Sequence, residues 1–141
     1  MKNSRIVIDA SFFLKLFLPE ENSDKAEVLW RKWIEDSTEI VSPTLIVFET
    51  VSVLRNKVFR GILADDDAKE IIQQVKDFDL SLVYTEDIVD IVWEVGKELN
   101  APVLYDCYYL AVSKFLSAPL WTADEKFYSS AKKKYPVINL L

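Results

Sequence analysis

Short apolar runs alternate along the chain with longer segments in which apolar residues recur at helical spacing. Residues 5–9 are mostly β-branched and end at an aspartate, which predicts a buried parallel strand. Residues 10–18 are strongly apolar and stop at Pro19, which predicts a short helix. Residues 22–36 predict a longer helix, because Asn22 and the two polar residues after it suit helix capping and the apolar positions that follow have helical spacing.

The same alternation continues to the end of the chain. Residues 39–42 predict a second strand, and Pro43 is expected at the first position of a helix that runs to about Phe59 and stops at Gly61. Further helices are expected at 64–77, 85–100, 106–115 and 123–134, and further strands at 80–84, 119–122 and 137–139. Strands that alternate with helices predict an α/β domain around a mostly parallel sheet, in which ligands bind at the carboxyl ends of the strands.

The length and composition fit a single domain over residues 1–141. Half of the residues are hydrophobic, which is enough for one core, and the length leaves no room for a second domain of ordinary size. The apolar runs are too short to span a bilayer, and the N-terminus lacks the features of a signal peptide. We therefore expect a soluble cytoplasmic protein that does not bind a membrane.

The absence of certain residue types narrows the possible chemistry. The chain has no histidine, which excludes Ser-His-Asp and Cys-His catalysis and histidine zinc sites. Its only cysteine, Cys107, allows neither an internal disulfide nor a cysteine-rich zinc site. With two glycines, it has no glycine-rich loop for phosphate. The side chains left for catalysis are mainly carboxylates, hydroxyls, lysine and arginine.

The net charge of −6 argues at first sight against a nucleic-acid partner, because a phosphate backbone attracts basic surfaces. The argument weakens if part of the negative charge belongs to a metal site, since bound divalent ions reverse the local sign. The overall charge therefore leaves the nature of the partner open.

Three acids occur where an unpaired charge is costly. Asp9 ends an apolar strand, while Glu49 and Asp106 lie in predicted helices. Their neighbours on the same helix face are uncharged: Leu45, Ile46, Ser52 and Val53 for Glu49, and Pro102, Val103, Tyr109 and Leu110 for Asp106. A hard divalent cation that prefers oxygen ligands would compensate all three, and Asp124 follows a predicted strand on the same sheet edge as Asp9.

Each acid also has a purely structural explanation. Asp9 can cap the following helix, and Glu49 can pair with a distant cation such as Arg55. Asp106 can be an ordinary first-turn acid that the helix dipole stabilises. Asp124 lies in a sequence that resembles a capping box. The residues taken singly leave these explanations open.

Four segments, in their order along the chain, carry a resemblance to a known family. They are residues 6–11, 43–49, 105–111 and 120–127. Together they resemble the PIN domain, and specifically the VapC-type toxin ribonucleases of prokaryotic toxin–antitoxin pairs. The resemblance extends over essentially the whole chain. It implies a three-layer α/β/α sandwich around a mostly parallel sheet, in agreement with the alternating pattern.

The resemblance also implies roles for individual residues. It assigns catalytic and metal-binding roles to four acids, Asp9, Glu49, Asp106 and Asp124. Ser11 and Thr122 match accessory hydroxyl positions of the family, although such residues are normally just helix caps. One position departs from the pattern, since Cys107 stands where the family commonly has a small residue; this departure does not affect the acids.

The function implied by the resemblance is hydrolysis of RNA phosphodiester bonds with Mg²⁺ or Mn²⁺, leaving a 5′-phosphate. It further implies a homodimer and a small cognate antitoxin protein that blocks the site. The alternative is a non-catalytic PIN-like scaffold or protein-interaction module. An aspartyl-phosphate phosphatase is a second alternative, but it would be expected to have an aspartate at position 11, where this chain has Ser11.

Overall fold

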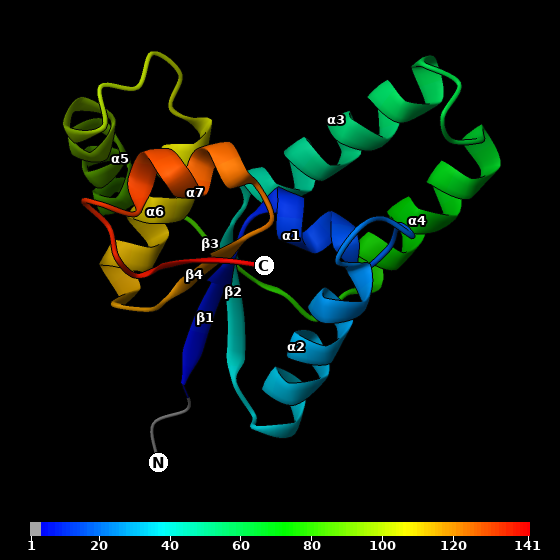
Figure 1. The fold of residues 1–141 in the computed structure, drawn as a ribbon, viewed down its shortest axis with the longest axis horizontal. Helices are drawn as coiled ribbons and strands as arrows, with labels where there is room; N and C mark the ends of the chain where they lie inside the picture. Colours follow the sequence, from blue (N-terminus) through cyan, green and yellow to red (C-terminus); the bar gives the residue numbers. More distant parts are fainter. Residues whose placement is uncertain (1–3) are drawn as a thin grey trace.

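A five-stranded sheet forms the centre of the computed structural model, which describes residues 4–141 (Figure 1). The strands are β1 (Arg5–Ile8), β2 (Glu39–Pro43), β3 (Ser81–Val83), β4 (Leu120–Thr122) and β5 (Ile138–Leu140). Their order across the sheet is β3-β2-β1-β4-β5, and every neighbouring pair is parallel. The carboxyl ends of all five strands therefore lie at one edge, as the alternating pattern predicts.

Helices cover both sides of the sheet. They are α1 (Ala10–Lys15), α2 (Ser23–Glu35), α3 (Leu45–Phe59), α4 (Asp65–Asp77), α5 (Glu86–Glu98), α6 (Tyr105–Leu116) and α7 (Glu125–Ala131). Figure 1 shows α5, α6 and α7 on one side and α1 to α4 on the other, as right-handed crossovers between these strands require. The structure thus confirms the predicted α/β/α sandwich. Within residues 4–141, none of the helices has the length and apolar character needed to cross a membrane.

The core lies between the sheet and the helices that flank it. Val7 and Ile8 of β1 are completely buried, which explains why this strand is apolar almost throughout. Phe12 and Phe13 of α1 are buried: the centroid of the Phe12 ring lies 5.4 Å from that of Trp33 in α2, and the Phe13 ring packs against Phe78. This packing fixes α1 directly after β1 and so fixes the residue between them, Asp9.

The structure corrects the predicted start of α3. Pro43 is the last residue of β2, and the helix begins at Leu45, after Thr44. Pro43 lies opposite Val83 of β3 and beyond the part of β2 that pairs with β1, so its missing N–H removes no bond to β1. The predicted end is correct: α3 stops at Phe59, and Gly61 follows in a left-handed conformation with φ of 72°.

Other predicted helix ends also differ from the structure, and α1, predicted over 10–18, ends at Lys15. Asn22 does not cap α2 through its side chain; it adopts a left-handed φ of 67°, and the Ser23 hydroxyl makes the local hydrogen bonds instead. The C-terminal helix, predicted over 123–134, is α7 and spans only Glu125–Ala131. It starts late because Asp124 is its N-cap.

Candidate functional site

The four predicted acids line one cleft of about 400 Å³ at the carboxyl edge of the sheet. Asp9 follows β1 and Asp124 follows β4, which are neighbouring strands. Glu49 comes from the first half of α3, and Asp106 is the second residue of α6. Four segments that are distant in sequence therefore bring their carboxylates to the same cavity, as expected for strand ends that share one edge.

Asp9 is the most deeply buried of the four acids, with 4% of its surface exposed. Its Oδ1 accepts hydrogen bonds from the Phe12 N–H (2.9 Å) and the Ser11 hydroxyl (2.7 Å). Its Oδ2 accepts one from the Thr122 hydroxyl (2.5 Å). Burial raises the pKa of Asp9 to about 6, although these hydrogen bonds act to lower it. Asp9 is therefore the helix cap that its position suggested and also part of the cleft.

Ser11 and Thr122 hold this carboxylate by means of a small network. Their hydroxyl oxygens lie 3.2 Å apart. Ser11 Oγ accepts a hydrogen bond from the Ala123 N–H (2.9 Å), and Thr122 Oγ1 accepts one from the Asp124 N–H (3.0 Å). The two hydroxyls thus connect Asp9 to the chain that leaves β4. Beyond any capping role, Thr122 orients the carboxylate from the neighbouring strand and Ser11 orients it from α1.

Glu49 has a buried carboxylate oxygen without a partner. Its Oε1 is inaccessible to solvent and accepts no hydrogen bond from the described part of the chain. Burial raises the pKa of Glu49 to about 7, and the negative charges of Asp106 and Asp9 add to this effect. The predicted alternative, an ion pair with Arg55, is wrong, because the Arg55 guanidinium lies over the Phe59 ring, 5.8 Å from its centroid.

Asp106 and Asp124 lie at the exposed rim of the cleft. Partial burial and the charge of Asp124 raise the pKa of Asp106, which also occupies the first turn of α6. Asp124 caps α7: its Oδ1 accepts hydrogen bonds from the N–H groups of Lys126 (2.9 Å) and Phe127 (3.1 Å). Within residues 4–141 its Oδ2 accepts none, so this oxygen has no competing partner.

Tyr109 also lines the cleft, although it was not predicted as a site residue. Its hydroxyl is buried and, among the residues described, forms no hydrogen bond of normal geometry. The hydroxyl is nevertheless close enough to Glu49 for each group to affect the other. Tyr109 acts to lower the pKa of Glu49, while burial and then the charge of Glu49 raise the pKa of Tyr109. The spacing of three residues from Asp106 along a helix was the available signal.

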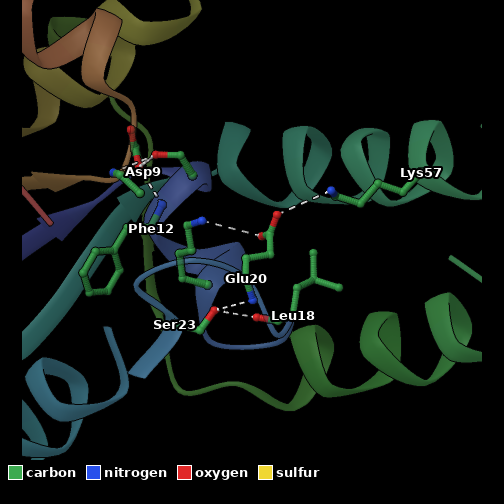
Figure 2. Close-up of polar contacts among 9 residues, drawn as sticks. Asp9, Phe12, Leu18, Glu20, Ser23 and Lys57 are labelled. Carbon is green, nitrogen blue, oxygen red and sulfur yellow. Dashed lines mark hydrogen bonds and ion pairs between the residues drawn. The ribbon is translucent and has the colours of Figure 1, made fainter. Parts of the chain in front are cut away.

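Two lysines complete the lining, and sequence reasoning did not identify them. Lys15 is the last residue of α1, and Lys57 lies two helical turns after Glu49 on α3. Both contact Glu20, which belongs to the loop after α1 (Figure 2). The cleft therefore has an acidic part around Asp9 and a basic part around Lys15 and Lys57.

Comparison with known protein families identifies the family of this chain. The model of the PIN domain matches residues 6–133, which is most of the chain and includes all four acids. The chain belongs to the PIN domain family.

Individual PIN domains show the same likeness. Ribonuclease VapC3 of Pyrobaculum aerophilum is 26% identical over 137 residues, which cover 95% of this chain and 97% of that protein. The sarcin-ricin loop cleaving toxin VapC20 of Mycobacterium tuberculosis has a similar fold, with a TM-score of 0.64 at 16% identity over 89% of this chain and 94% of that one. A toxin–antitoxin complex from Klebsiella pneumoniae gives a TM-score of 0.60 at 14% identity, with 95% of both chains covered.

The residues of the cleft fit the divalent cation that the PIN resemblance implies. In the described part of the chain, no three acids lie close enough together to bind one ion directly. The donors are nevertheless hard carboxylate oxygens, one of them the partnerless buried oxygen of Glu49. Mg²⁺ commonly keeps several of its waters and takes only one or two carboxylates from a protein. The acids of the cleft would therefore hold a hydrated ion partly through its water molecules.

Proposed function

We propose that this PIN domain is a metal-dependent endoribonuclease that hydrolyses RNA phosphodiester bonds and is the toxin of a VapBC-type toxin–antitoxin pair. The observation that carries the proposal is the convergence of Asp9, Glu49, Asp106 and Asp124 on one cleft. The names of two relatives, Ribonuclease VapC3 and the sarcin-ricin loop cleaving toxin VapC20, support RNA as the substrate.

Mg²⁺ or Mn²⁺ would be held by the four acids. A bound divalent cation supplies a nucleophile at neutral pH, because it lowers the pKa of a water that it coordinates. Asp9 is preorganised for this role, since Ser11 and Thr122 fix its two oxygens. Among the residues that the structure describes, Glu49 offers a buried oxygen that accepts no hydrogen bond of normal geometry. Such a site needs no histidine as a base, and the chain has none.

The acids have a second effect once ionised. Their combined negative charge would repel an RNA phosphate, so compensation by the cation and by nearby basic side chains would favour substrate binding. Asp106 and Asp124 lie at the rim, where a substrate backbone would enter, whereas Asp9 lies at the buried end. Asp9, whose carboxylate is preorganised, is therefore the acid of the cleft that is least exposed to solvent.

We further propose that a small antitoxin covers the cleft and that the toxin forms a homodimer. An apolar surface beside the acids supports a protein partner: Phe48, Val103 and Tyr105 are 70%, 60% and 60% exposed and line a hollow together with Glu49 and Asp106. The structurally similar Klebsiella pneumoniae protein belongs to a toxin–antitoxin complex, which supports an antitoxin as that partner.

The alternative of a non-catalytic scaffold makes a different prediction, and RNA cleavage distinguishes the two. The purified protein is incubated with labelled RNA and Mg²⁺ or Mn²⁺, and in parallel with a chelator. We expect internal cuts that leave 5′-phosphate ends, stop with chelator and return when metal is added. The Asp9→Asn variant should be inactive, while Asp36→Asn, an exposed acid at the end of α2, should cleave normally. Cleavage that persists in chelator would contradict the proposal.

A further inference from the structure

The basic part of the cleft consists of two lysines that share one carboxylate. Lys15 Nζ lies 3.9 Å from Glu20 Oε1, and Lys57 Nζ lies 3.5 Å from Glu20 Oε2. Figure 2 shows the Glu20 side chain directed across the cleft toward Lys57. Each lysine contacts a different oxygen of the same carboxylate, which leaves one positive charge uncompensated. This is the arrangement in which two lysines also bind a phosphate, with one ammonium near each of two oxygens.

The lysines are sheltered, whereas the carboxylate is more open. The side chains of Lys15 and Lys57 are 17% and 24% exposed, against 35% for Glu20. Both lysines lie on helices, α1 and α3, so their positions are set by the packing of the domain. Glu20 belongs to a loop, and a change of its side-chain rotamer would release both contacts. The two lysines therefore form the fixed part of the cluster and the carboxylate the movable part.

The loop holds the backbone of Glu20 in place even though its side chain is open. The Glu20 N–H donates a hydrogen bond to Ser23 Oγ (2.9 Å), and the Ser23 hydroxyl donates one to the Leu18 carbonyl (2.6 Å). Figure 2 shows these bonds directly below the contact to Lys57. A tethered carboxylate has a high effective concentration at the lysines, so an anion from solution must compete with it.

The position of the cluster relates it to the acids. Glu49, Val53 and Lys57 follow each other at intervals of four residues along α3, and all three line the cleft. At a rise of about 1.5 Å per residue, Lys57 lies about 12 Å along the helix from Glu49. A nucleic-acid strand with one phosphate at the acids would have another phosphate further along the cleft, in the region of the lysines.

We propose that Lys15 and Lys57 form a subsite for a backbone phosphate of RNA, and that the Glu20 carboxylate occupies this subsite until RNA displaces it. The inference rests on the proposed function, because it assigns the substrate of that site. Glu20 thereby lowers the affinity for RNA and reduces the dependence of binding on salt. If the Glu20 ion pairs served only to join α1 to α3, removal of the Glu20 charge would not strengthen the binding of RNA.

The test measures binding separately from cleavage. The fluorescence anisotropy of a short labelled oligouridine is followed in the presence of chelator, at several salt concentrations, with wild type, Glu20→Gln, Glu20→Asp, Lys15→Met and Lys57→Met. Glu27→Gln is the matched control, because Glu27 also pairs with a cation, Arg31, and its loss changes the net charge equally. Circular dichroism verifies that each variant is folded.

We expect Glu20→Gln to bind the oligonucleotide roughly three- to tenfold more tightly, because it frees two charge contacts. Its salt dependence should be steeper by about 0.7 in the slope of log K against log salt, the value for one phosphate of a single strand. Glu20→Asp, which is too short to reach both lysines, should be intermediate. Either lysine variant should bind more weakly, and Glu20→Gln should have no effect when both lysines are methionine.

The outcomes separate this inference from the proposed function. Wild-type cleavage of RNA combined with unchanged or weaker binding by Glu20→Gln would overturn the subsite and leave the ribonuclease intact. An equal gain in Glu27→Gln would also overturn it, because the effect would then be one of net charge. The expected binding pattern without any cleavage would retain the subsite and contradict the ribonuclease. Absence of both binding and cleavage would contradict both.

Discussion

The Thr122 hydroxyl donates a hydrogen bond of 2.5 Å to Oδ2 of Asp9, across a separation of 113 residues in the chain. The bond joins the last residue of β4 to the acid that follows β1. Both residues are buried, so the hydroxyl orients the carboxylate at the deep end of the cleft. The orientation of the most buried acid of the cleft therefore depends on the pairing of these two strands.

Removal of this hydroxyl should impair both the site and the fold. Thr122→Val keeps the shape of the side chain next to Asp9 but removes one hydrogen bond to its carboxylate. We expect cleavage to fall about 10- to 100-fold, the usual effect of losing a group that orients a metal ligand. The loss of stability should be about 1.5–3 kcal/mol, as for a hydrogen bond to a charged group. Thr122→Ser, which keeps the hydroxyl, should retain most of the activity in the same assay. Full activity in Thr122→Val would show that the orientation of Asp9 does not matter.

The stability of the metal-free protein should fall as the pH rises. The pKa values of Asp9 and Glu49 are raised to about 6 and about 7 in the folded chain, against roughly 4 when unfolded. A carboxyl with a raised folded pKa stabilises the fold below its unfolded pKa, and this contribution is lost as the pH rises through the folded value. For Asp9 the shift from 3.8 to about 6 corresponds to about 3 kcal/mol. The Tm should therefore decrease between about pH 4 and about pH 7.

Two comparisons identify the groups behind this pH dependence. Glu49→Gln should flatten the upper part of the Tm profile, because its neutral side chain no longer ionises within the protein. Glu94→Gln, an exposed acid of α5, should follow the wild type. Added Mn²⁺ should raise the Tm most at high pH, since it binds the ionised carboxylates. A wild-type Tm that does not change with pH would be inconsistent with these raised pKa values.

Substitutions of Asp124 distinguish its role as a helix cap from its proposed role in metal binding. Asn is as good an N-cap as Asp, so Asp124→Asn should retain stability within a few tenths of a kcal/mol, whereas Asp124→Ala should lose about 1 kcal/mol. If Asp124 also binds the cation, Asp124→Asn should lower cleavage even though its Tm is normal. Denaturant unfolding and the RNA assay measure the two effects independently. Normal cleavage by Asp124→Asn would restrict this residue to its capping role.

The sequence predicts the order of strands and helices well, because hydrophobic periodicity is a local property. Helix ends are less predictable, since they depend on which side chain finds a backbone donor in the folded chain. Asp124 accepts hydrogen bonds from two N–H groups of α7, so the helix starts after it. Asn22 instead adopts a left-handed conformation and makes no side-chain cap, and the Ser23 hydroxyl bonds the loop that precedes α2. Pro43 fits the end of a strand as well as the start of a helix, and only the pairing with Val83 decides between them.

The acidic part of the cleft was predictable for a similar reason. The carboxyl ends of parallel strands share one edge of the sheet. The residues on the same helix face as Glu49 and Asp106 include no cation that could pair with them. The basic part was not predictable, because Lys15 and Lys57 meet only through Glu20 and the conformation of its loop. Likewise, the sequence could not decide whether Arg55 reaches Glu49; the structure places it against Phe59 instead.

The most direct test of the metal site is the affinity of the pure protein for Mn²⁺, measured by isothermal titration calorimetry at about pH 8, where the raised pKa values leave the carboxylates ionised. Wild type is compared with the double variant Asp9→Asn/Asp106→Asn and with the double variant Asp36→Asn/Glu94→Gln, two exposed acids, as the control for net charge. We expect the double variant to lose the binding isotherm and the control to keep it. Equal affinity in wild type and double variant would contradict a metal site at these carboxylates.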